Sequence, residues 1–192
     1  MKRYVFASIR MAVLTMVVLG LVYPLAVTGL AQVIMPAQAN GSLVTSANGA
    51  IIGSSLIGQG FTNAKYFHGR PSAAGVDGYD ATASSATNLA PTSKALVDSV
   101  AARVATVVAE NPGLASGAVP VDMVTASGSG LDPDITLANA YAQIVRVASA
   151  RGMSVDEVRA LVDATVTGRQ FGFLGEPRVN VLALNIALDA AR

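Results

Sequence analysis

The sequence predicts an α+β protein: one N-terminal transmembrane helix, residues 11–35, precedes a single extracytoplasmic domain, residues 36–192, with a small sheet and about four helices. Three observations predict this fold class. Residues 11–35 form an uncharged apolar run. Basic residues precede the run, and none follows it until Lys65. The rest of the chain alternates between segments with helical apolar periodicity and short β-branched or glycine-rich segments.

The apolar run is long enough to cross a bilayer. As an α-helix it would extend about 38 Å, and the hydrocarbon core is roughly 30 Å thick. Pro36 ends it, and Pro24 should disturb it by freeing a carbonyl near Gly20. Such breaks are tolerated where neighbouring helices pack against the span, so we expect the anchor to dock onto other membrane helices; the alternative to docking is that one proline and a few small residues are ordinary features of a membrane span. The alternative is a cleaved signal peptide, with Ala37-Gln38-Ala39 as cleavage site.

The distribution of basic residues predicts the orientation of the anchor. Lys2, Arg3 and Arg10 all precede the apolar run. Because basic residues favour the cytoplasmic side of a membrane, residues 1–10 should be cytoplasmic. Residues 36–192 should then lie outside the cytoplasm.

Composition excludes several kinds of chemistry. The chain of 192 residues has a net charge of +1, no cysteine and one histidine, His68. The lack of cysteine excludes disulfides, thiolate nucleophiles and cysteine-based metal sites. A Ser-His-Asp triad would depend on His68 alone. Basic residues form no stripe along the chain, which argues against nucleic acid as a partner.

The first part of the domain should contain a β-hairpin and a long loop. Asn48-Gly49 suits a two-residue type I′ turn, which predicts a hairpin over residues 42–58. Residues 59–92 are rich in glycine, serine, alanine, asparagine and proline. Such a long segment without regular structure is either functional or packed on a partner, or it is a surface loop anchored by Tyr66 and Phe67.

Apolar periodicity and capping signals predict four helices. They cover residues 93–110, residues 135–150, a segment beginning at Ser154, and a segment from Asn180 to about 191. Ser154 and Glu157 match a capping box. Val179-Asn180-Val181 also permits the start of a strand.

The remaining element expected is a strand over Val119–Thr125, followed by a loop over residues 126–133. Inward-facing side chains should recur along the helices; the expected set is Leu96, Val97, Val100, Val104, Val107, Val108, Leu137, Tyr141, Ile144, Ala148, Val155, Val158, Leu161, Val162, Leu184 and Leu188.

Few residue patterns point to catalysis. No P-loop motif occurs. Ser127-Gly128-Ser129-Gly130 could present backbone N–H groups to an anion, or could simply form a tight turn. Asp132 and Asp134 are too few to hold calcium, and Asp134 equally suits a helix N-terminus. His68, close to Arg70 in sequence, suggests a polar contact rather than a base. A membrane-anchored hydrolase that uses His68 as its base is the alternative function.

Several stretches together resemble a known family. They are Gly53–Gln59, Tyr66–Ala73, Val124–Pro133 and Gly175–Leu182, in that order behind a single anchor. In this respect the chain resembles the C subunit of the bacterial Kdp potassium-transporting P-type ATPase. Two positions depart from the family pattern: Asp134 replaces a usual histidine, and Ala90 replaces a usual glycine.

The resemblance implies a non-catalytic accessory subunit in a bacterial plasma membrane. Its expected partners are a P-type ATPase catalytic subunit, a channel-like potassium-binding subunit and a small single-span subunit. The family is described as a catalytic chaperone that raises the catalytic subunit's apparent ATP affinity. ATP association is implied by the resemblance only, no tightly bound cofactor or metal is expected, and the predicted topology favours an indirect effect. The expected partner or regulatory surface comprises Tyr66, His68, Arg70, Ser127, Gly128, Ser129, Gly130, Asp132, Arg178 and Asn180.

Overall fold

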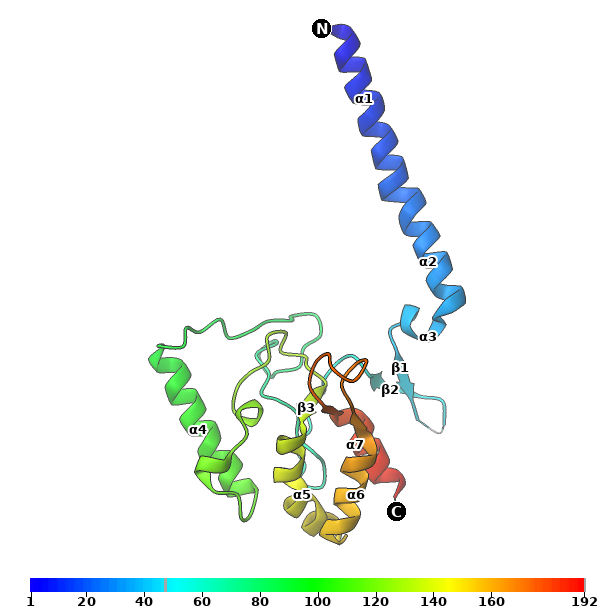
Figure 1. The fold of residues 1–192 in the computed structure, drawn as a ribbon. Helices are drawn as coiled ribbons and strands as arrows, with labels where there is room; N and C mark the ends of the chain where they lie inside the picture. Colours follow the sequence, from blue (N-terminus) through cyan, green and yellow to red (C-terminus); the bar gives the residue numbers. More distant parts are fainter. Residues whose placement is uncertain (47, 192) are drawn as a thin grey trace. The chain divides into compact units, whose positions relative to one another are not determined.

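The computed structural model describes residues 1–46 and 48–191, and the chain divides into two compact units, Met1–Ile52 and Gly53–Arg192. The first unit contains one continuous helical segment, Lys2–Ile34, which is long and apolar enough to cross a membrane. The segment comprises α1 (Lys2–Val17), the π-helix η1 (Val18–Val22) and α2 (Tyr23–Ile34) (Figure 1). The predicted apolar helix is therefore present, and it begins nearer the N-terminus than residue 11.

The disturbance predicted at Pro24 takes the form of a π-helical turn. The N–H of Tyr23 donates to the carbonyl of Val18, five residues earlier. This wider turn lies directly before Pro24, which occupies the first turn of α2. Because the first turn of a helix needs fewer backbone donors, the π-turn lets the helix continue past the proline.

The predicted β-hairpin is confirmed in its strands. A short helix, α3 (Pro36–Ala39), precedes β1 (Leu43–Thr45), which pairs with β2 (Ile51–Ser54). The N–H of Ser46 donates to the carbonyl of Ala50 at 2.9 Å. The connection is therefore longer than the two-residue turn expected at Asn48-Gly49.

The second unit combines four helices with a small sheet, which confirms the predicted α+β class. The sheet is antiparallel with strand order β3-β5-β4, and Ile135 and Val166 both pair with Val179 of the central strand. The elements are α4 (Lys94–Glu110), η2 (Ser116–Ala118), η3 (Val121–Met123), β3 (Asp134–Thr136), α5 (Leu137–Arg151), α6 (Val155–Thr165), β4 (Val166–Thr167), β5 (Arg178–Asn180) and α7 (Val181–Ala190).

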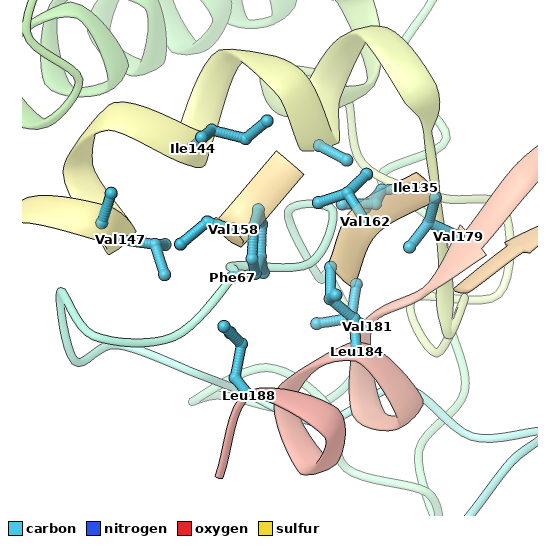
Figure 2. Packing of buried hydrophobic residues seen from close by; sticks show 12 residues of the cluster. Phe67, Ile135, Ile144, Val147, Val158, Val162, Val179, Val181, Leu184 and Leu188 are labelled. Carbon is cyan, nitrogen blue, oxygen red and sulfur yellow. The ribbon is translucent and has the colours of Figure 1, made fainter. Parts of the chain in front are cut away.

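The core lies between α5, α6, α7 and one face of the sheet (Figure 2). Phe67 from the long loop is also completely buried there. The loop thus supplies the largest side chain of the core, which accounts for its ordered path without regular structure. The members of the core are Phe67, Ile135, Ala140, Ile144, Val147, Ala148, Val158, Val162, Val179, Val181, Leu184 and Leu188.

Helix boundaries follow the predicted capping signals. Gly152 ends α5 with φ of +67°, a conformation that glycine adopts without strain. Ser154 and Glu157 form the predicted capping box. The Asn180 side chain accepts from the Ala183 N–H at 3.0 Å and so caps α7, although Asn180 also ends β5. Thr136 caps α5 in the same way.

The strand predicted at Val119–Thr125 is wrong, because this segment forms the 3₁₀ turn η3 instead. Pro120 precedes the turn, and the Asp122 carboxylate accepts hydrogen bonds from the Thr136 N–H at 2.9 Å and from Asn139 Nδ2 at 3.0 Å. These contacts hold the segment against the start of α5, so β-branched composition does not decide its structure. The strand lies instead at β3, where the second helix was expected to begin.

Three predicted inner-face residues are exposed. Tyr141 points outward, where its hydroxyl donates to Asp163 at 2.7 Å and the Arg159 guanidinium lies over its ring. Val155, in the first turn of α6, is also exposed. Val97 is exposed on α4, which stands apart from α5, α6 and α7 (Figure 1). No residue of α4 is fully buried, and the other residues of its apolar face are intermediate in exposure.

Candidate functional site

Two side-chain amides hold the long loop against the helices. Asn185 of α7 accepts from the Phe67 N–H at 2.8 Å and donates to the Phe67 carbonyl at 3.0 Å. Gln143 of α5 makes the same pair of bonds to His68, at 2.8 and 3.0 Å. These bonds fix the backbone from which Arg70 projects.

Arg70 forms an ion pair with Asp132. The guanidinium Nη1 lies 2.9 Å from Asp132 Oδ2, and both side chains are about three-quarters buried. Asp132 Oδ1 also accepts from the Asp134 N–H at 3.0 Å. On the other side, the Tyr79 hydroxyl donates to the Arg70 carbonyl. Burial, and secondarily the charge of Asp132, raises the pKa of Tyr79 to about 12, so the hydroxyl remains a donor.

Asp134 links this ion pair to the sheet. Its carboxylate lies 2.8 Å from Arg178 Nε and accepts from Asn180 Nδ2 at 3.2 Å. Arg178 and Asn180 are two residues apart on β5, so their side chains share one face. Asp134 is opposite Asn180 in the register. It therefore serves as a cross-strand partner, which corrects its interpretation as a helix N-terminal acid.

The two ion pairs of Arg70 and Arg178 line a cavity of about 280 Å³ that we call the charged cleft. Its two arginines are each bonded to an aspartate, and Asp122 and Glu176 add further acidic groups to its lining. Among the described residues, no group of three or more histidine, aspartate or glutamate side chains could hold a metal ion. The charged residues that line the cleft are Arg70, Asp122, Asp132, Asp134, Glu176 and Arg178.

Hydrogen bonds from the long loop hold the predicted glycine loop in place. The Ser129 carbonyl accepts from the Ser85 N–H at 3.0 Å, and the Ser72 hydroxyl donates to the Gly130 carbonyl at 2.6 Å. Gly130 has φ of +69°, and a Cβ there would lie 2.7 Å from the Ser85 carbonyl oxygen. Glycine is therefore required at this position.

Only part of the glycine loop reaches the surface. Ser127 and Gly130 are buried, whereas Gly128 and Ser129 are exposed. Asp132, which follows the exposed part of the loop, forms an ion pair with Arg70. The loop also lies between η3 and β3, rather than between a strand and a helix as expected.

His68 faces away from Arg70 and belongs to a second cluster. Its Nε2 lies 3.2 Å from the Asn63 carbonyl and 3.4 Å from Arg146 Nη1, and its Nδ1 lies 3.7 Å from Glu110 Oε2. Burial, followed by the charge of Arg146, lowers the pKa of His68 below 6.5. The polar contacts of His68 are therefore made with Asn63, Arg146 and Glu110, and Arg70 is not among them. Within the described residues, no hydroxyl group is among the ring's hydrogen-bond partners.

The His68 cluster borders a cavity of about 260 Å³ between α4 and α5. Arg146 lies beneath it and donates to the backbone carbonyls of Ala64 and Tyr66 at 2.7 and 2.9 Å. It also donates to the side chains of Asn111 and Gln143. This arginine therefore holds the loop in place, and its charge favours the neutral form of His68.

The side chain of Tyr66 lies apart from both clusters, near the end of α7. Its hydroxyl donates to Asp189 at 3.0 Å, and the Arg151 guanidinium lies 5.0 Å from its ring centre. Arg151 pairs with Asp189 at 2.7 Å and donates to the Leu188 carbonyl at 3.1 Å. Burial raises the pKa of Asp189, but the hydrogen bonds from Arg151 and Tyr66 outweigh this and lower it.

The structure thus brings together four of the expected site residues, Arg70, Asp132, Arg178 and Asn180, around Asp134. It places His68 and Tyr66 elsewhere. Sequence reasoning missed the linking role of Asp134 and the polar side chains that position the loop, because their partners are distant in the chain. The positioning residues that were missed are Asn111, Gln143, Arg146, Arg151 and Asn185.

The fold and the charged cleft define a class of protein: one membrane-length helix joined to an α+β domain in which Arg70 and Arg178 of the cleft each pair with an aspartate. A family model described as "K+-transporting ATPase, c chain" matches residues 5–190. The chain therefore belongs to the KdpC family.

Curated relatives support this assignment over nearly the whole chain. A potassium-transporting ATPase KdpC subunit from Myxococcus xanthus is 57% identical, covering 95% of this chain and 85% of its own. The KdpC subunit of Caulobacter vibrioides is 56% identical, with coverage of 96% and 91%. That of Koribacter versatilis is 55% identical, with coverage of 100% and 97%.

Proposed function

We propose that this chain is a non-catalytic accessory subunit of an ATP-driven, high-affinity potassium-uptake complex in a bacterial plasma membrane. The observation that carries the proposal is the family match over residues 5–190, together with relatives named as subunits of a potassium-transporting ATPase. The helix at Lys2–Ile34 would anchor the chain in the membrane that holds the complex.

The geometry supports a non-catalytic role. His68, the chain's one histidine, lies among a carbonyl, a guanidinium and a carboxylate. Asp132 and Asp134 each bind an arginine. General acid–base catalysis needs a titrating group within reach of the proton that it transfers, and these contacts favour fixed structure instead.

The chain would assist assembly and raise the apparent ATP affinity of the P-type ATPase catalytic subunit. Its other partners would be the channel-like potassium-binding subunit and the small single-span subunit. We place the domain outside the cytoplasm because basic residues precede the anchor. The effect on ATP would then be indirect, through a shift in the populations of the pump's conformations.

Co-purification in mild detergent tests this role. The complex should retain the chain, and a complex prepared without it should show a higher KM for ATP in potassium-stimulated hydrolysis. His68→Gln should leave hydrolysis by the assembled pump within about twofold of wild type. An unchanged KM without the chain would overturn the role in ATP use, and complete loss of activity in His68→Gln would support an enzymatic function.

A reporter fused after residue 192 tests the orientation. A reporter that works only outside the cytoplasm should be active, and one that works only in the cytoplasm should be silent. The reverse pattern would place the domain with cytoplasmic ATP and make direct contact with the nucleotide the better explanation.

Replacement of the anchor tests whether it also docks. The π-turn before Pro24 and the small residues Gly20, Thr28 and Gly29 suit helix–helix contact in lipid. A poly-leucine span in place of residues 11–35 should keep the domain at the membrane but weaken co-purification. Unchanged co-purification would assign assembly to the domain alone.

A further inference from the structure

The connection between β4 and β5, residues 168–177, presents three large apolar side chains to solvent. Phe171 is 88% exposed, Phe173 69% and Leu174 47%. We call these three residues the aromatic tip. The chain has only five phenylalanines, so two of them at one exposed turn form a concentrated apolar feature.

The connection holds the aromatic tip in a defined shape. Thr167 and Arg178 pair at its base in the sheet. Arg169 and Glu176 form an ion pair one step further along. The backbones of Gln170 and Leu174 then exchange two hydrogen bonds of 2.9 Å. Three successive cross-links thus support the tip, so little conformational freedom would be lost when it binds.

Packing within the described part of the domain does not explain the aromatic tip. Phe171 has φ of +53°, a left-handed conformation that is unfavourable for a residue with a side chain. A Cβ added to Gly172 or Gly175 would meet no atom within 4 Å. The turn therefore stands clear of the rest of the domain. A phenylalanine here is both strained and solvated, which is the pattern of a residue kept for binding.

We propose that the aromatic tip inserts into an apolar pocket on another subunit of the potassium-transporting ATPase, an inference that rests on the proposed function. Aromatic side chains that fill a partner's pocket supply much of the binding energy of an interface. Glu176 and Arg178 follow the tip directly and line the charged cleft. An apolar anchor beside a polar rim matches the usual anatomy of a protein interface.

The charge of the turn favours a protein pocket over a lipid surface. Its one basic residue, Arg169, is paired with Glu176. Residues 168–177 contain no lysine, tryptophan or tyrosine. Segments that bind anionic membranes combine basic residues with aromatics, and tryptophan and tyrosine are enriched at membrane interfaces. The turn has no unpaired basic residue and neither tryptophan nor tyrosine.

A single tryptophan can report where the tip lies, because the chain has no natural one. We would place Phe171→Trp in the full chain and reconstitute it in lipid, either alone or with the other subunits. The emission is taken as the difference from the same sample with the wild-type chain. The expected result is solvent-like emission in lipid alone and a shift to shorter wavelength when the other subunits are present.

Two results would overturn the inference. A shift in lipid alone, with quenching by brominated lipids, would assign the tip to the membrane. Solvent-like emission in an assembled complex would show that the tip does not dock, while leaving the proposed function intact. Failure of the wild-type chain to assemble would instead overturn the proposed function, and the proposed docking with it.

Binding of substituted chains provides a second readout. Phe171→Ser with Phe173→Ser should weaken association of the full chain with the other subunits by about tenfold or more. Val76→Ser is the control, because Val76 is a fully exposed apolar residue in a different loop. Both variants should keep the wild-type melting temperature. Wild-type affinity of the double variant would overturn the docking role.

Discussion

The side chain of Asn185 binds both backbone polar groups of Phe67. Its Oδ1 accepts from the N–H at 2.8 Å and its Nδ2 donates to the carbonyl at 3.0 Å. Both residues are buried, and 118 positions separate them in the chain. Buried backbone groups need hydrogen-bond partners. The side-chain amide of Asn185 supplies to this loop residue the acceptor and the donor that a neighbouring strand would supply in a sheet. It allows Phe67 to fill the core.

We predict that Asn185→Leu destabilises the protein by about 2–4 kcal/mol, because it leaves a buried N–H and a buried carbonyl unpaired. Chemical or thermal unfolding of the full chain would measure the change. Gln38→Leu, which replaces an exposed amide, is the control and should change stability by less than about 0.5 kcal/mol. Equal stability of Asn185→Leu and wild type would show that the amide does not hold the loop.

Elements with local signals could be predicted from the sequence. The capping box at Ser154 and Glu157 depends on residues within one helical turn, and the structure confirms it. The structure of Val119–Thr125 could not be predicted from local signals. Its β-branched residues are typical of strands, but Asp122 contacts the start of α5 and the segment turns instead.

The charged cleft was only partly predictable, because its residues come from distant parts of the chain. Arg70 and Asp132 are 62 positions apart, and Asp134 and Asn180 are 46 apart. No spacing rule relates such pairs. β3 is likewise a strand because β5 pairs with it, and its three residues alone carry too weak a pattern. The sequence therefore indicated several of these residues but not the contacts between them.

His68 should make stability depend on pH near neutrality. Burial and the adjacent Arg146 of α5 lower its pKa below 6.5, more than the Asn63 carbonyl and Glu110 of α4 raise it. Between the two pKa values the unfolded chain binds more protons than the folded one. The free energy of unfolding should therefore fall as pH drops below about 6.5 and level off below the folded-state pKa.

His68→Gln tests this dependence, because glutamine can still donate to Asn63. Melting temperatures of the full chain would be compared from pH 5.5 to 7.5. The chain has no second histidine. The difference in melting temperature between wild type and His68→Gln should therefore change with pH below about pH 7 and be constant above it. A parallel decline in both proteins as pH falls would assign the dependence to other groups.

The capping box at α6 should contribute measurably to stability. The Ser154 hydroxyl accepts from the Glu157 N–H at 3.2 Å, and the Glu157 carboxylate accepts from the Ser154 N–H at 2.8 Å. Ser154→Ala should cost about 0.5–2 kcal/mol and lower the melting temperature, while assembly at low temperature persists. The control is Ser149→Ala, the same change at an exposed position inside α5, which should not destabilise.

Asp132→Asn should separate folding from function in the charged cleft. The substitution keeps the shape of the side chain and its bond to the Asp134 N–H, but removes the charge that faces Arg70. Because the pair is only partly exposed, the variant should remain folded with a stability lower by about 1–2 kcal/mol. If this region forms a partner or regulatory surface, potassium-stimulated ATPase activity of the assembled pump should fall.

A matched control distinguishes loss of the ion pair in the charged cleft from a general effect of removing one negative charge. Asp98→Asn removes the same charge from the exposed ion pair with Lys94 on α4, where a pair four residues apart contributes less than about 0.5 kcal/mol. It should leave both stability and pump activity at wild-type levels. If Asp132→Asn also retains full activity, the cleft is structural. If Asp132→Asn fails to fold, Arg70→Lys becomes the decisive variant. This substitution keeps the positive charge but loses the planar guanidinium group. A folded Arg70→Lys chain with normal pump activity would rule out a regulatory role for the pair.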